Sequence, residues 1–212
     1  KASYGKIYGQ WLCGCAVMAF DFEKFSPSKI LKVIEKFKVT SFCAPPTAYR
    51  YFVKKGMQMY DLSSLEYLTT AGEALNPIVA EAVYQQTGLH PMEGYGQSET
   101  TLLIANLNGT YGKTGSIGKP SPMYDIRLVD SDGNEVKQGE TGEIVVIPPK
   151  DRKQYGIFTN YIGDEQMYQY AWRKGMYHTN DTAYMDEDGY YWYVGRADDL
   201  IKTRGYRVGP FE

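Results

Sequence analysis

The stretch Leu65–Gly94 decides the fold; it reads LEYLTTAGEALNPIVAEAVYQQTGLHPMEG. The apolar run Leu65–Thr70 predicts a strand, and Leu89–Met92 predicts another. Between them, Asn76-Pro77 predicts the start of a helix, because Asn caps helices and Pro suits the first helical position, and Gly88 predicts its end. Two strands joined through a helix indicate parallel pairing.

The residues before this stretch repeat the same alternation. Ser26-Pro27 opens a helix with apolar residues at helical spacing, Val39–Cys43 predicts a strand, and Thr47–Lys55 predicts a second helix. The first half is therefore expected to be an α/β fold with a parallel, doubly wound sheet. Ligands of such sheets bind beyond the carboxyl ends of the strands, which here are Ala44-Pro45, Gly72-Glu73 and Glu93-Gly94.

From about Tyr111 onward the helix signal fades and turns multiply. Asp132-Gly133 and Asp188-Gly189 each separate two segments that predict strands. Asp-Gly in this position is a strong hairpin signal. The second half is therefore expected to be a small antiparallel, β-barrel-like subdomain, and the predicted domain ranges are 1–112 for the α/β part and 113–197 for the β part.

The composition excludes several classes of protein. Lys and Arg number 23 and Asp and Glu 25, so the net charge of −2 argues against a nucleic-acid-binding surface. A hydrophobic content of 43% with 23% charged residues is that of a globular protein rather than a disordered one. No apolar run is long enough to predict a membrane span.

The cysteines are too few for a disulfide scaffold. An odd count of three, Cys13, Cys15 and Cys43, together with no leader-like stretch after Lys1, predicts a cytoplasmic protein. Cys13 and Cys15 are expected to be small core residues rather than metal ligands, because neither histidine has ligand-like spacing to them.

The segment Glu93–Thr100, EGYGQSET, has the residues of a phosphate-binding loop. Its two glycines flank an aromatic residue, so the backbone is expected to turn tightly and admit a flat ligand. The Ser98 hydroxyl can donate to a phosphate oxygen, and the Glu99 carboxylate can hold Mg²⁺. It is not a dinucleotide fingerprint, since Glu99 stands where the third glycine belongs. An ordinary glycine-rich loop after a strand is the alternative.

Two further segments carry weaker signals. In Tyr177–Asp181, YHTND, an Asp on a sharp turn could accept two ribose hydroxyls, or it could only bond its own backbone. Val194–Pro210 combines glycines with mixed charges, which is typical of a hinge or functional loop and also of a solvated linker.

Taken together, these segments resemble those of one family. The chain resembles the adenylate-forming superfamily, and within it the medium-chain and branched-chain acyl-CoA synthetases, essentially from end to end. The segments that carry the resemblance are Lys6–Trp11 (KIYGQW), Phe42–Thr47 (FCAPPT), Ala71–Pro77 (AGEALNP), Glu93–Thr100, Gly115–Pro120 (GSIGKP), Tyr177–Asp181 and Val194–Glu212.

The resemblance implies that a carboxylic acid is activated with ATP to an acyl-adenylate and then passed to coenzyme A, with Mg²⁺ as cofactor, in fatty acid metabolism. It implies that Ser98, in place of the family's usual Thr, contacts the α-phosphate, that Glu99 holds the metal, and that Tyr95 stacks on the adenine. The implied nucleotide-binding residues are Gly72, Glu73, Ala74, Glu93, Gly94, Tyr95, Gly96, Asp181 and Arg196.

Other roles carried over by resemblance concern the two ends of the chain. Residues 198–212 would be a hinge at Asp198 and the start of a small C-terminal domain, whose Gly205 and Tyr206 approach coenzyme A. Bulky Tyr4 and Trp11 would line the acyl pocket and suit a short or branched acid.

Two departures from the family pattern matter. Asn180 stands where the family usually has Gly, and the turn is expected to be kept because Asn tolerates positive φ. The family's phosphate loop and catalytic lysine do not occur in these residues, so the chain is expected to be a fragment that forms no adenylate alone and that self-associates. An adenylation domain serving a carrier protein and a non-catalytic AMP-binding module remain alternatives.

Overall fold

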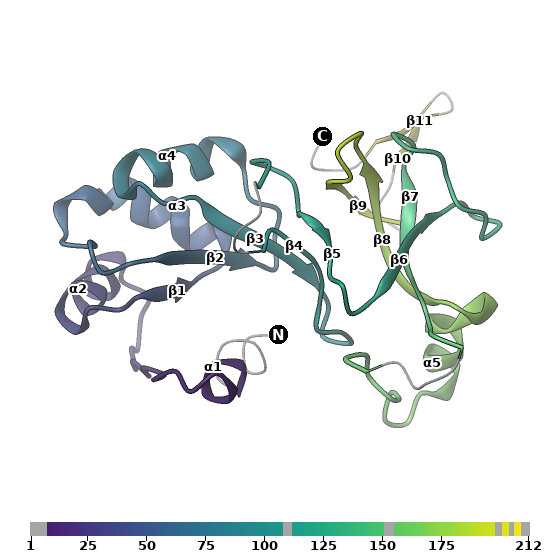
Figure 1. Cartoon of the computed structure of the whole chain (residues 1–212), viewed down its shortest axis with the longest axis horizontal. Helices are drawn as coiled ribbons and strands as arrows, with labels where there is room; N and C mark the ends of the chain where they lie inside the picture. The colour runs from purple at the N-terminus through teal and green to yellow at the C-terminus, as the bar shows by residue number, and fades with distance from the viewer. Residues whose placement is uncertain (1–7, 108–111, 151–154, 198–200, 204–205, 209–212) are drawn as a thin grey trace. The chain divides into compact units, whose positions relative to one another are not determined.

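The computed structural model describes residues 8–107, 112–150, 155–197, 201–203 and 206–208. By their internal packing, the residues form two compact units, Lys1–Gly94 and Tyr95–Glu212, which are described one at a time (Figure 1). The domain ranges expected from the sequence stay predictions.

The first unit alternates helices and strands, as the sequence predicts. Its strands β1, β2 and β3 pair in parallel, with Cys43 opposite Thr69 and Ala71 opposite Gly94. The last of these strands continues past Gly94 into the second unit. The elements are α1 (Gly9–Leu12), α2 (Pro27–Phe37), β1 (Ser41–Cys43), α3 (Pro46–Lys55), the short 3₁₀ helix η2 (Met57–Met59), β2 (Tyr67–Ala71), α4 (Pro77–Thr87) and β3 (Pro91–Gly96).

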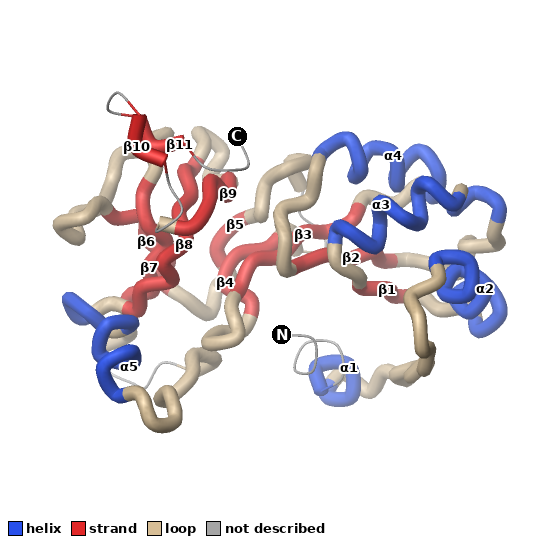
Figure 2. The backbone as a smooth tube through the Cα atoms, turned by 180° about the vertical axis from the view of Figure 1, so that it is seen from behind, coloured by secondary structure: helices blue, strands red, loops and turns tan. Residues whose placement is uncertain are grey.

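The helix ends follow from local chemistry. The Asn76 side chain accepts a hydrogen bond from the Ile78 backbone N–H at 2.8 Å and so caps α4, and Gly88 ends that helix in the left-handed region at φ 74°. Helix α3 lies between α2 and α4 in both views (Figures 1 and 2). The three helices and the strands bury a common core that includes Leu31, Ile34, Tyr49, Phe52, Leu68 and Val83.

The second unit contains the predicted hairpins. Strands β6, β7, β8 and β9 form an antiparallel sheet in that order, in which β6–β7 and β8–β9 carry the two Asp-Gly turns. Among the described residues this sheet is open rather than a closed barrel. The elements are β4 (Leu102–Ala105), β5 (Lys119–Pro120), β6 (Asp125–Val129), β7 (Gly142–Ile147), α5 (Glu165–Ala171), η3 (Arg173–Gly175), β8 (Tyr177–Met185), β9 (Tyr191–Arg196), β10 (Ile201–Thr203) and β11 (Tyr206–Val208).

The core of the second unit is separate from that of the first. It joins the apolar residues of β4, β6, β7 and β8 to the aromatic side chains that follow residue 155, and Leu103, Ile104, Ile144 and Val146 are fully buried in it. Tyr95 packs against the edge of this core. The end of β3 is therefore anchored in the second unit.

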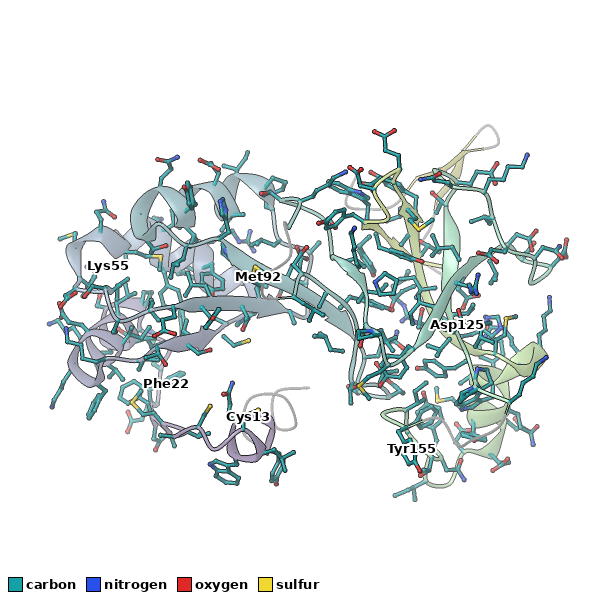
Figure 3. All side chains as sticks on the ribbon, in the orientation of Figure 1. Cys13, Phe22, Lys55, Met92, Asp125 and Tyr155 are labelled. Carbon is teal, nitrogen blue, oxygen red and sulfur yellow. The ribbon has the colours of Figure 1, made fainter. Side chains whose placement is uncertain are left out.

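Helix α5 and the two neighbouring cysteines differ from the sequence-based expectations. Helix α5 was not expected; Asp164 precedes and caps it, since the Asp164 side chain accepts from the Met167 N–H at 2.9 Å. Cys13 and Cys15 are exposed rather than buried in a core (Figure 3 labels Cys13). No helix in the described part of the chain is long and apolar enough to cross a membrane.

Candidate functional site

Asp181 lies in a bulge of strand β8 rather than on a sharp turn. On β8, Thr179, Asn180 and Asp181 stand between His178 and Thr182, whereas on β7 only Ile144 stands between their partners. Asn180 adopts φ 56°, which confirms the expectation that it takes the positive-φ conformation. The bulge turns the Asp181 side chain away from the regular alternation of the strand.

Glu143 on β7 holds this bulge in place. Its carboxylate accepts from the Asn180 backbone N–H, from Arg173 and from His178 Nδ1, each at 3.0 Å. Burial alone would raise the pKa of Glu143, but the hydrogen bond from His178 and the charge of Arg173 outweigh it and hold the pKa below its usual value. An ionised, fully bonded carboxylate therefore anchors the backbone of the residue that precedes Asp181.

The Asp181 carboxylate is buried and surrounded by donors. Tyr95 O–H and Gln97 Nε2 each donate to Oδ2 at 2.6 Å, and Tyr193 O–H donates to Oδ1 at 3.1 Å. Arg196, the register partner of Asp181 on β9, has its Nη1 3.7 Å from Oδ1. Burial and then the Asp181 charge raise the pKa of Tyr95 well above its usual range, so the phenol stays a neutral donor.

The loop after Tyr95 brings Glu99 to the same unit. Phe158 N–H donates to the Glu99 backbone oxygen at 2.7 Å, and Tyr161 O–H donates to Glu99 Oε1 at 3.0 Å. Burial, then the charge of Glu99 and more weakly that of Asp181, raise the pKa of Tyr177 well above its usual range. The charges of both carboxylates therefore act on Tyr177, whose hydroxyl donates to Gln97 Oε1 at 2.8 Å.

The glycines of the motif do not make the tight turn that the sequence predicts. Strand β3 instead runs through Gly96 in extended conformation. A Cβ at Gly96 would collide with the Thr101 carbonyl oxygen, so the absence of a side chain is needed for close backbone packing and not for positive φ. Ser98 follows with an exposed side chain.

In the first unit, the predicted residues meet at the carboxyl ends of β2 and β3. Gly72 adopts φ 102° after β2, and the exposed Glu73 accepts from the Thr47 hydroxyl at 2.7 Å. Glu93 is buried and accepts from the Leu75 backbone N–H at 3.1 Å. The loop of residues 72–75, which includes the exposed Ala74, is thereby held beside Glu93.

Several predicted site residues lie outside the part of the chain that the structure describes. Tyr4, Asp198 and Gly205 lie outside the described residues, and Tyr206 is described only as backbone of β11. Trp11 is 58% exposed on α1. Within the described ranges, no group of three or more His, Cys, Asp or Glu side chains is arranged to hold a metal ion.

Some residues of the site were not found by sequence reasoning. Gln97 and Tyr193 contact Asp181 directly, Tyr161 contacts Glu99, and Glu143 holds the bulge. Gln97 could have been found because it lies inside the quoted motif. The other three come from distant segments, and only the fold brings them to the site.

Glu93 predicts a pH dependence of stability. Burial raises its pKa to about 7 from 4.5, and among the described residues its Oε2 has no hydrogen-bond partner. Because the folded protein then holds the proton more tightly than the unfolded chain, Glu93 stabilises most below pH 4.5, and this contribution is lost as the pH rises through 7. The expected slope is about −1.4 kcal/mol of unfolding free energy per pH unit in that window.

Urea unfolding between these pH values measures this slope. Glu93→Gln keeps an acceptor for Leu75 and is expected to remove the contribution, whereas Glu81→Gln, on the exposed face of α4, should leave the slope unchanged. An identical pH profile for wild type and Glu93→Gln would contradict the prediction.

Comparison with known sequences identifies a protein family and several similar relatives. The family model "AMP-binding enzyme" matches residues 2–155. The chain is 40% identical to human mitochondrial acyl-coenzyme A synthetase ACSM3 and 41% identical to 4-hydroxybutyrate–CoA ligase 1 of Metallosphaera sedula, in both cases over 100% of this chain. It spans only 36% and 37% of the length of these relatives.

The expected cytoplasmic location is wrong on this comparison. The ACSM3 and ACSM4 relatives are named as mitochondrial proteins, in human and mouse alike. The reason for the error is that unpaired cysteines argue only against an oxidising compartment. They do not distinguish one reducing compartment from another.

Two solved structures have the same fold. The anthranilate-CoA ligase AuaEII in complex with anthranoyl-AMP matches 99% of this chain with a TM-score of 0.90 at 30% identity, and an acyl-CoA synthetase of Brucella canis matches 99% with a TM-score of 0.82 at 30% identity. The chain covers 39% of each of these structures. Because the family model matches more than half of the residues of this chain, the chain belongs to the AMP-binding enzyme family.

Proposed function

We propose that this chain supplies part of the nucleotide site of an AMP-forming acyl-CoA synthetase. The whole enzyme would join a carboxylic acid to ATP, release pyrophosphate, and then transfer the acyl group from the adenylate to the thiol of coenzyme A. The observation that carries the proposal is the buried Asp181 carboxylate, which Tyr95 and Arg196 approach within the second unit. Membership of the family and the acyl-CoA synthetases among the relatives support it.

The proposed roles follow the chemistry of each side chain. Asp181 would accept hydrogen bonds from the two ribose hydroxyls. Tyr95, Gln97 and Tyr193 already fill three of the about four lone-pair sites of this carboxylate, so one ribose hydroxyl would displace the Tyr193 hydroxyl. Arg196 would reinforce that contact, and the Tyr95 ring would offer its face to the adenine. The exposed Ser98 hydroxyl would donate to the α-phosphate. Gly72, Glu73, Ala74, Glu93, Gly94 and Gly96 stay proposed as the remaining nucleotide contacts.

Magnesium fits the donor set at Glu99. Mg²⁺ takes oxygen ligands and is commonly held by one or two carboxylates together with substrate phosphates. Tyr161 orients the Glu99 carboxylate through Oε1, and among the described residues no side chain bonds Oε2. The ion would neutralise charge on the phosphates, while Glu99 and Tyr161 hold its position.

The Tyr161–Glu99 contact gives a prediction for metal dependence. Tyr161→Phe removes the donor that orients the carboxylate, so the Mg²⁺ concentration for half-maximal activity is expected to rise about tenfold. Activity of the chimera described below, titrated with Mg²⁺, measures this. Tyr170→Phe on the exposed face of α5 is the control. Equal Mg²⁺ requirements for the two variants would contradict the role of Tyr161.

The choice of carboxylic acid and the roles of residues near the two ends of the chain are proposals. Tyr4 and Trp11 would limit the acyl pocket to a short or branched acid, Asp198 would be the hinge, and Gly205 and Tyr206 would approach coenzyme A. Trp11 and Leu12 are 58% and 89% exposed, and we propose that the chain self-associates through such apolar side chains. Sedimentation of the chain at several concentrations tests the last point.

A chimera tests the function. The 212 residues replace the aligned part of human ACSM3, to which they are 40% identical, and pyrophosphate release and acyl-CoA formation are measured with a series of acids. Acid-dependent release with acyl-CoA as product is expected, and the chain alone should form no adenylate. Transfer to a phosphopantetheinyl carrier but not to coenzyme A, or AMP binding without acid-dependent release, would overturn the proposal in favour of the two alternatives.

A further inference from the structure

Gln97 connects three groups of the second unit. Its Nε2 donates to Asp181 Oδ2 at 2.6 Å and to the Thr179 backbone oxygen at 2.7 Å, and its Oε1 accepts from Tyr177 O–H at 2.8 Å. Its backbone N–H donates to Thr100 Oγ1 at 2.9 Å, which fixes the start of the side chain. Both ends of the amide are therefore bonded to strand β8.

The partners determine how the amide is oriented. The Thr179 carbonyl and the Asp181 carboxylate can only accept, so the nitrogen must face them and the oxygen must face the Tyr177 hydroxyl. A side chain with two donors on one terminal atom and an acceptor on the other is needed at this position. Glutamate has the same shape but would place an oxygen against the Asp181 carboxylate.

The contacts of Gln97 control the geometry of Asp181 in two ways. One bond holds the carboxylate itself, and the other holds the carbonyl of Thr179, at the start of the bulge that carries Asp181. The Thr179 carbonyl and the Asn180 N–H belong to the same peptide group, so Gln97 bonds the oxygen of this group while Glu143 bonds its N–H. Together they fix both the backbone and the side chain of Asp181.

We propose that Gln97 is the positioning residue that orients Asp181 toward the ribose hydroxyls of the nucleotide. The proposal rests on the role of Asp181 in the proposed function. It assigns to Gln97 no contact with the nucleotide. Loss of the Gln97 amide should therefore weaken the binding only of ligands that have the ribose hydroxyls.

The ligand test compares AMP with 2′,3′-dideoxy-AMP, by calorimetry on the chimera and on the 212-residue chain. Gln97→Met keeps the volume but loses both donors, and it is expected to weaken AMP binding about tenfold to a hundredfold, the range for a hydrogen bond to a charged group, with little effect on the dideoxy ligand. Gln97→Glu should be worse, because two carboxylates then face each other. Gln169→Met on the exposed face of α5 is the matched control and should change neither affinity.

The outcomes separate the two proposals. If the wild type binds AMP and dideoxy-AMP equally, or binds neither, the role of Asp181 fails. If the wild type prefers AMP and Asp181→Asn abolishes the preference while Gln97→Met retains it, only the role of Gln97 fails. A crystal structure of Gln97→Met without ligand gives a further test, since an Asp181 carboxylate and a Thr179–Asp181 bulge unchanged from the wild type would overturn the positioning role.

Discussion

Asp181→Asn is expected to weaken AMP binding to the chimera by at least about a hundredfold. Each hydrogen bond from a neutral donor to a charged acceptor contributes about 1.5–3 kcal/mol. In the variant, both ribose hydroxyls would meet a neutral amide in place of the charged carboxylate. The substitution also places an NH₂ group against a donor in either orientation, because Tyr95 and Gln97 donate to one carboxylate oxygen and Tyr193 donates to the other. Calorimetric titration with AMP measures the loss.

The control for this substitution uses the same chemical change elsewhere in the unit. Asp132→Asn lies in the exposed β6–β7 hairpin, where Asn-Gly suits the turn as well as Asp-Gly does. It should leave both AMP affinity and folding unchanged. If Asp181→Asn bound AMP as the wild type does while circular dichroism showed it folded, the ribose role of Asp181 and the proposal built on it would both fail.

The regular parts of the fold could be predicted because their signals are local. Asn76 and Gly88 mark the two ends of α4 by their own capping chemistry, and each Asp-Gly pair marks a hairpin. Such signals lie within a few residues of the structure that they determine. Helix α5 was missed although its cap, Asp164, is of the same kind, because its seven residues bury only Ala171 and show no apolar face.

The site could be predicted only in part. Motifs indicated Tyr95, Glu99 and Asp181, whose roles stay predictions. The bulge that orients Asp181 depends on Glu143, Arg173 and His178, which no local pattern connects. A glycine in the sequence is also ambiguous, since it can indicate either a positive φ or close backbone packing. At Gly96 the sequence predicts a turn, whereas the Thr101 carbonyl requires close packing in an extended strand.

At Gly118, in the motif GSIGKP, glycine is required for both reasons, and this gives the largest expected effect on stability. Its φ is 100°, and an added Cβ would collide with the Ala105 carbonyl group and the Asn106 nitrogen at the end of β4. Its own backbone oxygen accepts from Tyr191 N–H at 2.8 Å, so the segment cannot move away without losing a bond to β9. Gly118→Ala is therefore expected to cost about 4 kcal/mol of unfolding free energy, measured by urea denaturation.

Gly139→Ala separates the steric clash from the backbone strain. Gly139 also has a positive φ, 84°, but an added Cβ there meets nothing within 4 Å. Its substitution should cost only the strain of a positive φ, about 1 kcal/mol. The difference between the two variants then measures the backbone collision at Gly118. Equal losses would mean that the end of β4 moves away from Gly118 easily, and the close approach of these two backbone segments would not be what makes glycine necessary in this motif.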